Sequence, residues 1–258
     1  MNTILLVPTG EGAGVTSASL GLVSAFAFKG VQAGFLKPFS QDPRNSVDTT
    51  TSLQQHLFPT HKAVQPISYD QIIQALASGQ LDELLEDAVK LHREVSAQHN
   101  VVVVEGLLPT ANDPFVNQIN LALAQALDAK VVIVSTADTQ NARRSAEKLD
   151  AQIRNFGGVE GGRLAGVFFM RTKGLASAEI PLAIDPSLRL NDEIARFTTE
   201  LQKFNARIGT DKLPILGLVP FSDTLSVPRT FDIADIIEAT WLNQGEAKQR
   251  RILNTNLV

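Results

Sequence analysis

The sequence predicts an α/β protein, built on a parallel sheet with helices on both faces. Segments rich in branched apolar residues recur along the chain, helical patterns lie between them, and the strongest of these segments are apolar at every position. Strands of that kind are typical of a parallel sheet that is covered on both faces. The alternation of strands and helices also argues against a sandwich, in which strands follow one another across turns.

Strands are expected at residues 1–7, 31–36, 101–104, 130–135, 164–170 and 213–219. Apolar residues with helical spacing predict helices at about 18–30, 69–98 with a break near Ser78 and Gly79, 114–127, 138–156, 192–205 and 231–241. Asp48 is a good N-cap and opens a further helix at Thr49. Residues 171–191 carry Pro181 and Pro186 and are expected to form a long excursion.

Composition predicts one domain over residues 1–242 and a polar tail or linker over 243–258. The 258 residues are 44% hydrophobic, which is enough for the core of one α/β domain. The formal net charge is −4 and the 23 Lys and Arg are scattered, which argues against nucleic acid or an anionic membrane as the main partner. Cysteine is absent and no run of about 18 apolar residues occurs, so we expect a soluble, cytoplasmic protein.

A glycine-rich loop joins the first expected strand to the first expected helix. It holds Gly10, Gly12 and Gly14, and Thr16 and Ser17 follow. Glycines let backbone N–H groups converge on an anion, and the free amides at a helix start add the positive end of the helix dipole. These five residues are therefore candidates for binding a phosphate or another anion.

Val15 stands where the nucleotide-binding motif G-x-x-x-x-G-K-[ST] requires a lysine. The Thr16 hydroxyl that would hold Mg²⁺ is present, but the ammonium that would reach the phosphates is missing. The loop is either a weakened anion binder or only a tight turn between strand and helix, and the motif supports both interpretations equally. Lys37, at the end of the next expected strand, either supplies part of the missing charge or is an ordinary lysine held extended by Pro38.

Thr16, Asp48 and Glu105 are candidate ligands of a metal ion. Ligand sites in parallel sheets lie at the carboxyl ends of the strands, and Glu105 directly follows four valines. Oxygen ligands suit Mg²⁺ with bound waters and phosphate, so a nucleotide or a phosphate with magnesium is the cofactor to test. The alternative is that Asp48 only caps a helix and that Glu105 is a satisfied loop residue. We expect no catalytic residue.

Several blocks resemble the N-terminal domain of the long bacterial form of phosphate acetyltransferase. In chain order they are Ile4–Gly10, Gly14–Ser17, Gly30–Val31 with Phe35–Pro38, Asp48–Thr51, Val103–Thr110, Asn155–Gly158, Gly166–Val167 and Leu213–Pro220. That domain is similar in turn to dethiobiotin synthetase and the cobyrinic acid amide synthases, which use ATP and keep the loop lysine. The resemblance therefore implies a P-loop NTPase-like fold of the dethiobiotin synthetase type.

The resemblance also implies a role. The parent enzyme converts acetyl-CoA and phosphate to acetyl phosphate and CoA in a C-terminal domain that lies beyond this chain. This domain would be regulatory and oligomer-stabilising, with the rest of the polypeptide, further copies and a small-molecule effector as partners. The alternative is a free-standing ATP-dependent enzyme of the dethiobiotin synthetase type, with Thr16, Lys37, Asp48 and Glu105 around Mg-ATP. Met170 and Arg171 stand where such enzymes carry an asparagine that reads the purine.

Overall fold

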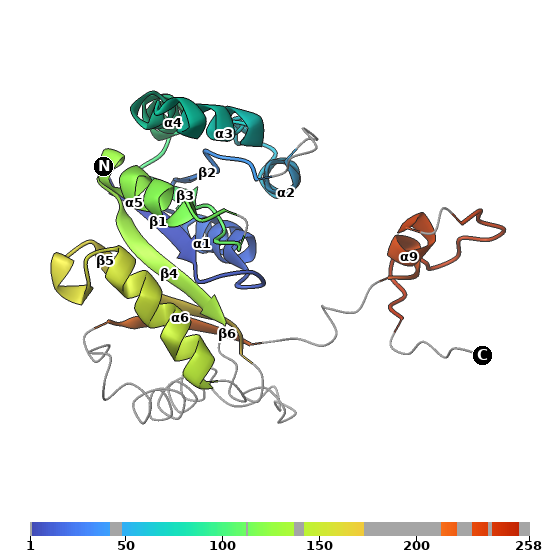
Figure 1. Cartoon of the computed structure of the whole chain (residues 1–258). Coiled ribbons are helices and arrows are strands. Elements are labelled where there is room, and N and C mark those ends of the chain that lie inside the picture. The colour runs from blue at the N-terminus through green and yellow to red at the C-terminus, as the bar shows by residue number, and fades with distance from the viewer. Residues whose placement is uncertain are drawn as a thin grey trace.

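The computed structural model describes residues 2–41, 48–111, 113–136, 142–172, 213–220, 229–236 and 239–252. Within these ranges a sheet runs in the order β2-β3-β1-β4-β5-β6 (Figure 1). Each pair of neighbouring strands is parallel, so the predicted α/β fold with a parallel sheet is confirmed. The strands are β1 (Asn2–Pro8), β2 (Ala33–Leu36), β3 (Val101–Glu105), β4 (Lys130–Thr136), β5 (Leu164–Thr172) and β6 (Ile215–Pro220).

The helices are α1 (Val15–Phe28), α2 (Thr49–Leu57), α3 (Tyr69–Ser78), α4 (Leu81–Ser96), α5 (Val116–Ala126), α6 (Ala142–Asn155), the short 3-10 helix η2 (Val159–Gly161) and α9 (Thr230–Ile236). The predicted break between α3 and α4 lies at Gly79, whose φ of 72° ends α3 in the left-handed region. The predicted helix at 192–205 and the excursion beyond Thr172 lie outside the described residues. None of the helices seen in these ranges is long and apolar enough to cross a membrane.

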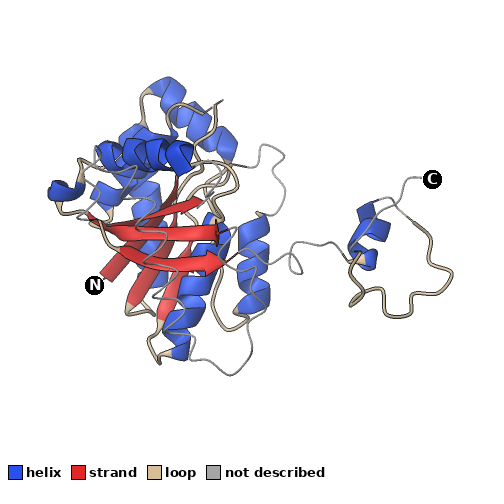
Figure 2. Ribbon diagram, turned by 90° about the horizontal axis from the view of Figure 1, so that it is seen from below, coloured by secondary structure: helices blue, strands red, loops and turns tan. Residues whose placement is uncertain are grey.

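Helices cover both faces of the sheet (Figure 2). On one face α1 packs against alternate strand residues such as Leu6 and Val103. On the other face α3, α4 and α5 pack against the intervening residues, such as Leu5 and Val104, and α6 packs against Ile133. Because successive side chains of a strand point to opposite faces, a strand buried on both sides is apolar at most of its positions.

β1 lies in the middle of the sheet and determines where the site forms. Leu6 is paired with Glu105 of β3, and Pro8 is paired with Val134 of β4. The glycine loop after β1 and the residues after β2 and β3 therefore meet at one edge. In open parallel sheets this carboxyl edge is where ligands bind.

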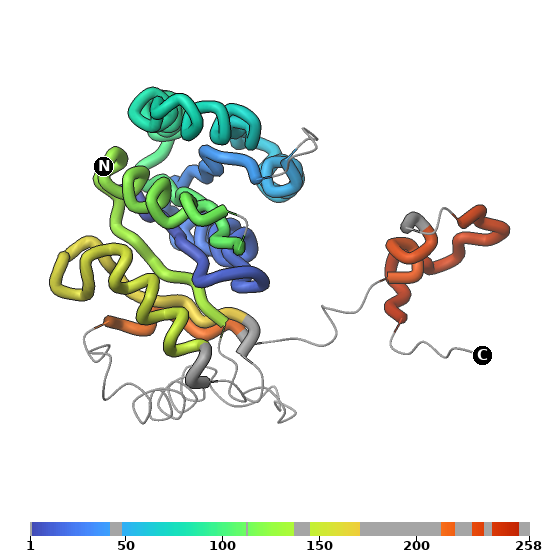
Figure 3. The backbone as a smooth tube through the Cα atoms, in the orientation of Figure 1, coloured from blue at the N-terminus to red at the C-terminus, as the bar shows by residue number. Residues whose placement is uncertain are grey.

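Residues 229–236 and 239–252 pack together and lie apart from the sheet (Figure 3). The Phe231 N–H donates to the Ala247 carbonyl at 3.1 Å, and the rings of Phe231 and Trp241 stack with centroids 6.2 Å apart. The division of the chain into 1–242 and 243–258 stays a prediction.

Candidate functional site

The glycine loop has the backbone conformation that only glycine adopts easily. Gly12 and Gly14 have φ of 73° and 78°, in the left-handed region. Gly14 is the N-cap of α1, which has neither a side-chain cap nor an acidic residue in its first turn. The helix begins at Val15 rather than at Ala18 as the sequence predicted, so Thr16 and exposed Ser17 lie in its first turn. No capping side chain therefore accepts a hydrogen bond from the amides of this turn.

Lys37 joins the predicted metal ligands into one cluster. Its Nζ lies 2.8 Å from Oδ2 of Asp48 and 3.6 Å from Oε1 of Glu105, and it donates to Thr50 Oγ1 at 3.2 Å. Thr16 Oγ1 donates to Glu105 Oε1 at 3.1 Å. The structure thus brings together Thr16, Lys37, Asp48 and Glu105 from four separate segments, as their positions after the strands suggested.

Asp48 uses both carboxylate oxygens within the protein. Oδ1 accepts from the Thr51 N–H at 3.1 Å, which makes Asp48 the N-cap of α2. Oδ2 accepts from Lys37 and, at 3.1 Å, from Ser40 Oγ. Burial alone would raise the pKa of Asp48, but the hydrogen bond and charge of Lys37, with the bonds from Thr51 and Ser40, hold it below its usual value. Asp48 is therefore ionised and fully engaged.

Glu105 is buried and only partly satisfied. Its side chain is 4% exposed, and Oε1 accepts from Thr16 and from Thr50. Oε2 has no hydrogen-bond partner within the part of the chain that the structure describes. Burial raises the pKa of Glu105, although the charge of Lys37 and the bond from Thr16 act in the opposite direction.

Two of the three predicted metal ligands, Asp48 and Glu105, lie against the ammonium of Lys37 instead of forming an open set of oxygens with Thr16. A metal ion on Asp48 would have to displace Lys37 or Thr51, so Thr16 and Glu105 Oε2 are what remains for a cation. The described ranges hold no group of three or more His, Cys, Asp or Glu arranged for a metal. The geometry fits a lysine-neutralised carboxylate cluster better than a magnesium centre. A nucleotide or phosphate with Mg²⁺ remains a prediction.

Two further polar residues at this edge were not predicted as part of the site. Thr50 contacts Lys37, Thr16 and Glu105, and its place just after the predicted cap Asp48 was the available signal. The other is Lys148 of α6, whose Nζ lies 3.6 Å from the point that a Cβ on Gly10 would occupy. Lys148 is exposed, and nothing in the sequence separates it from other lysines on helices. It makes no ion pair with any residue in the described ranges, so its ammonium is available beside the glycine loop.

The chain is similar to proteins named phosphate acetyltransferase. It is 62% identical over 260 residues to that of Acinetobacter baylyi, a match that covers 100% of this chain and 36% of the relative. It is 33% identical to that of Pseudomonas aeruginosa, covering 98% of this chain and 34% of the relative. The chain therefore spans about a third of the length of the curated relatives that it matches. The predicted resemblance to this group is confirmed.

Among solved structures, the fold is similar to a variant of Cyanothece McdA in complex with ATP, with 14% identity, 95% of this chain and 99% of that chain covered, and a TM-score of 0.49. The MinD cell division protein of Aquifex aeolicus gives 14% identity, 87% and 84% coverage, and a TM-score of 0.46. The family model described as AAA domain matches residues 2–229. With its parallel sheet and its glycine loop at the start of α1, the chain belongs to the AAA domain family.

Proposed function

We propose that this chain is a non-catalytic domain of a cytoplasmic phosphate acetyltransferase, with a regulatory and oligomer-stabilising role. One observation carries the proposal: the match extends over the whole chain but over only 36% of the Acinetobacter baylyi relative. The conversion of acetyl-CoA and phosphate to acetyl phosphate and CoA would then belong to the remaining part of the enzyme. The partners of this domain would be that remainder, further copies and a small-molecule effector.

The charges around the glycine loop support a non-catalytic role. Val15 cannot supply the cation that phosphoryl transfer requires at this position. Lys37 does not replace it freely, because its ammonium is paired with Asp48 at 2.8 Å and lies 3.6 Å from Glu105. Without the motif lysine in the loop itself, the loop can bind an anion but is poorly equipped to stabilise a transferring phosphoryl group.

The effector that suits this edge is a small phosphate-bearing anion. The uncapped first turn of α1 offers amides to it, and the ammonium of Lys148, which has no ion-pair partner in the described ranges, lies beside Gly10. Inorganic phosphate and the phosphates of a nucleotide share this chemistry. The rest of the enzyme would respond to the bound effector through the contacts that it makes with this domain.

Calorimetry on the full 258-residue chain tests the sensing role with phosphate, ATP, NADH and pyruvate as separate ligands. We expect heat with at least one phosphate-bearing ligand, and about threefold to tenfold weaker binding for Lys148→Ala. Lys29→Ala removes an exposed lysine just after α1 and is the matched control. If no ligand produces heat of binding, the sensing role is wrong. If Lys148→Ala binds as tightly as the wild type, only the assignment of Lys148 to the site is wrong.

The assembly role is tested in a complete enzyme. The Acinetobacter baylyi relative can be prepared with and without the third of its length that this chain matches. We expect the shortened enzyme to keep transferase activity but to form smaller or less stable oligomers, measured by light scattering during size-exclusion chromatography. Loss of all transferase activity in a folded, normally assembled shortened enzyme would contradict the proposal.

The second candidate is a free-standing ATP-dependent enzyme of the dethiobiotin synthetase type. The convergence of Thr16, Lys37 and Glu105 at one edge favours it, because such a cluster could hold Mg-ATP. ATP turnover by the wild-type chain, compared with Val15→Lys, separates the candidates. We expect no turnover by the wild type. Turnover that Val15→Lys barely increases would establish the second candidate instead.

A further inference from the structure

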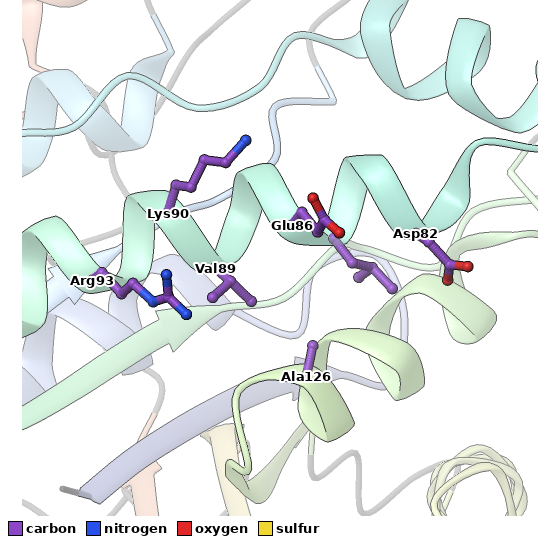
Figure 4. Close-up of a pocket in the computed structure, with 7 residues that line it drawn as sticks. Asp82, Glu86, Val89, Lys90, Arg93 and Ala126 are labelled. Carbon is purple, nitrogen blue, oxygen red and sulfur yellow. The ribbon is translucent and has the colours of Figure 1, made fainter.

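A groove between α4 and α5 shares no residue with the glycine-loop site (Figure 4). Its volume is about 470 Å³. Val89 of α4 and Ala126 of α5 point toward one another across it, and half-buried Leu85 completes an apolar strip. The other lining residues are charged and exposed: Asp82, Glu86, Lys90 and Arg93.

The charges on α4 are sorted along the helix. Asp82 and Glu86 line the N-terminal half of the groove, and Lys90 and Arg93 line the C-terminal half. The spacing of three or four residues places them on one side of the helix. Lys90 is paired with Asp87 at 2.6 Å, but Asp82 and Arg93 make no ion pair with any residue in the described ranges. Within the part of the chain that the structure describes, the two ends of the groove thus present unpaired charges of opposite sign.

We infer that α4 packs antiparallel against α4 of a second copy of this chain. In that arrangement Asp82 faces Arg93 of the second copy and Glu86 faces its Lys90, while Leu85 faces its Val89. A twofold axis near residues 87 and 88 allows all of these contacts at once, because the two residues of each pair lie at equal distances along α4 on either side of this point. In such an interface every contact occurs twice, once in each direction.

The charge pattern favours this occupant over other partners. A partner of uniform charge would be attracted to one half of the groove and repelled by the other, whereas a second α4 in antiparallel orientation complements both halves. α4 has 16 residues and is therefore about 24 Å long, so a pair of such helices buries less than a standard stable interface. We therefore expect a weak, salt-sensitive association that adds to other contacts in an oligomer.

This inference rests on the assembly part of the proposed function and is independent of the sensing part. Two variants of the full chain test it. Lys90→Glu with Arg93→Glu makes the groove wholly acidic, and Asp82→Lys with Glu86→Lys makes it wholly basic. Sedimentation equilibrium of the wild type is expected to show a monomer–dimer equilibrium, weakened by raised salt. Each variant alone is expected to dimerise at least about tenfold more weakly, and a mixture of the two is expected to form a one-to-one dimer.

The control is Lys29→Glu with Lys248→Glu, which changes the net charge as much as the acidic variant but lies off α4. It is expected to dimerise like the wild type, and circular dichroism checks that each variant is folded. A wild-type dimer that neither variant weakens would overturn the α4 contact and leave the assembly role intact. A wild type that stays monomeric, or variants that do not combine, would also overturn it, while the calorimetric test of sensing would be unaffected.

Discussion

The Nζ atom of Lys37 lies 2.8 Å from the Oδ2 atom of Asp48, and this ion pair decides what the carboxyl edge of the sheet can do. The lysine side chain is 18% exposed and the aspartate side chain 5% exposed, so the pair is largely removed from water. An ammonium held in this way neutralises neighbouring carboxylates instead of reaching a ligand at the glycine loop. The same contact connects β2 to the start of α2.

Replacing Lys37 by methionine should destabilise the protein. Asp48 and Glu105 would be left buried without their cation, which typically costs about 3 kcal/mol in the free energy of unfolding. Urea denaturation measures the change. Lys62→Met is the control, because the Lys62–Glu94 pair is exposed and 3.9 Å apart and should contribute less than about 1 kcal/mol. Equal losses in the two variants would show that the Lys37 cluster contributes no more than a surface pair.

Glu105→Gln should change how stability depends on pH. Burial raises the pKa of Glu105 above 4.5, although Lys37 and Thr16 lower it. A raised pKa means that this group's contribution to stability is complete below pH 4.5 and is lost as the pH rises through the raised value. Glutamine does not titrate, so the variant should gain stability relative to the wild type as the pH increases from about 4 to about 8.

Urea denaturation across that pH range measures the difference between Glu105→Gln and the wild type. The lowered pKa of Asp48 destabilises both proteins as the pH falls below 3.8, so to a first approximation it cancels in the difference. The matched control is Glu94→Gln, which removes a carboxylate from a side chain that is 54% exposed. A constant difference between Glu105→Gln and the wild type would mean that Glu105 has the same pKa folded and unfolded.

Gly106→Ala should destabilise the turn after β3. A Cβ at this position would lie 2.9 Å from the backbone oxygen of Leu6 and 3.1 Å from Oδ1 of Asn120. Relieving such a clash in a packed core typically costs about 2 kcal/mol. Gly21→Ala has nothing within 4 Å and lies inside α1, so it should stabilise the protein by about 1 kcal/mol. Thermal unfolding should therefore shift in opposite directions, and a common direction would contradict this account.

Asn120→Leu should also destabilise the turn after β3, because Asn120 of α5 forms hydrogen bonds with it. The Leu107 N–H donates to Asn120 Oδ1 at 2.9 Å, and Asn120 Nδ2 donates to the Leu107 carbonyl at 2.9 Å. Leucine leaves both buried backbone groups unpaired, at a cost of about 2 kcal/mol in the free energy of unfolding. Gln125→Leu, at an exposed position of the same helix, should change stability by less than about 0.5 kcal/mol. Similar urea midpoints for the two variants would show that the paired bonds to Leu107 are dispensable.

Local sequence patterns were sufficient to predict many of the strands and helices of this protein. Fully apolar segments such as Val101–Val104 indicated a parallel sheet covered on both faces, and Asp48 and Gly79 marked helix ends that the structure confirms. The start of α1 was placed too late, because Val15 and Thr16 lie in the first turn, where packing on the sheet does not yet impose a periodic pattern.

The sequence by itself determined the elements, the two-sided burial of the strands and the loss of the loop lysine at Val15. Only the tertiary structure decided that β1 lies between β3 and β4, that Lys37 pairs with Asp48 and Glu105, and that Lys148 of α6 lies beside Gly10. The physical reason is the range of the interactions. Periodicity records which side of a strand or helix is buried, whereas strand order and side-chain partners depend on contacts between residues far apart in the chain, which no local pattern encodes.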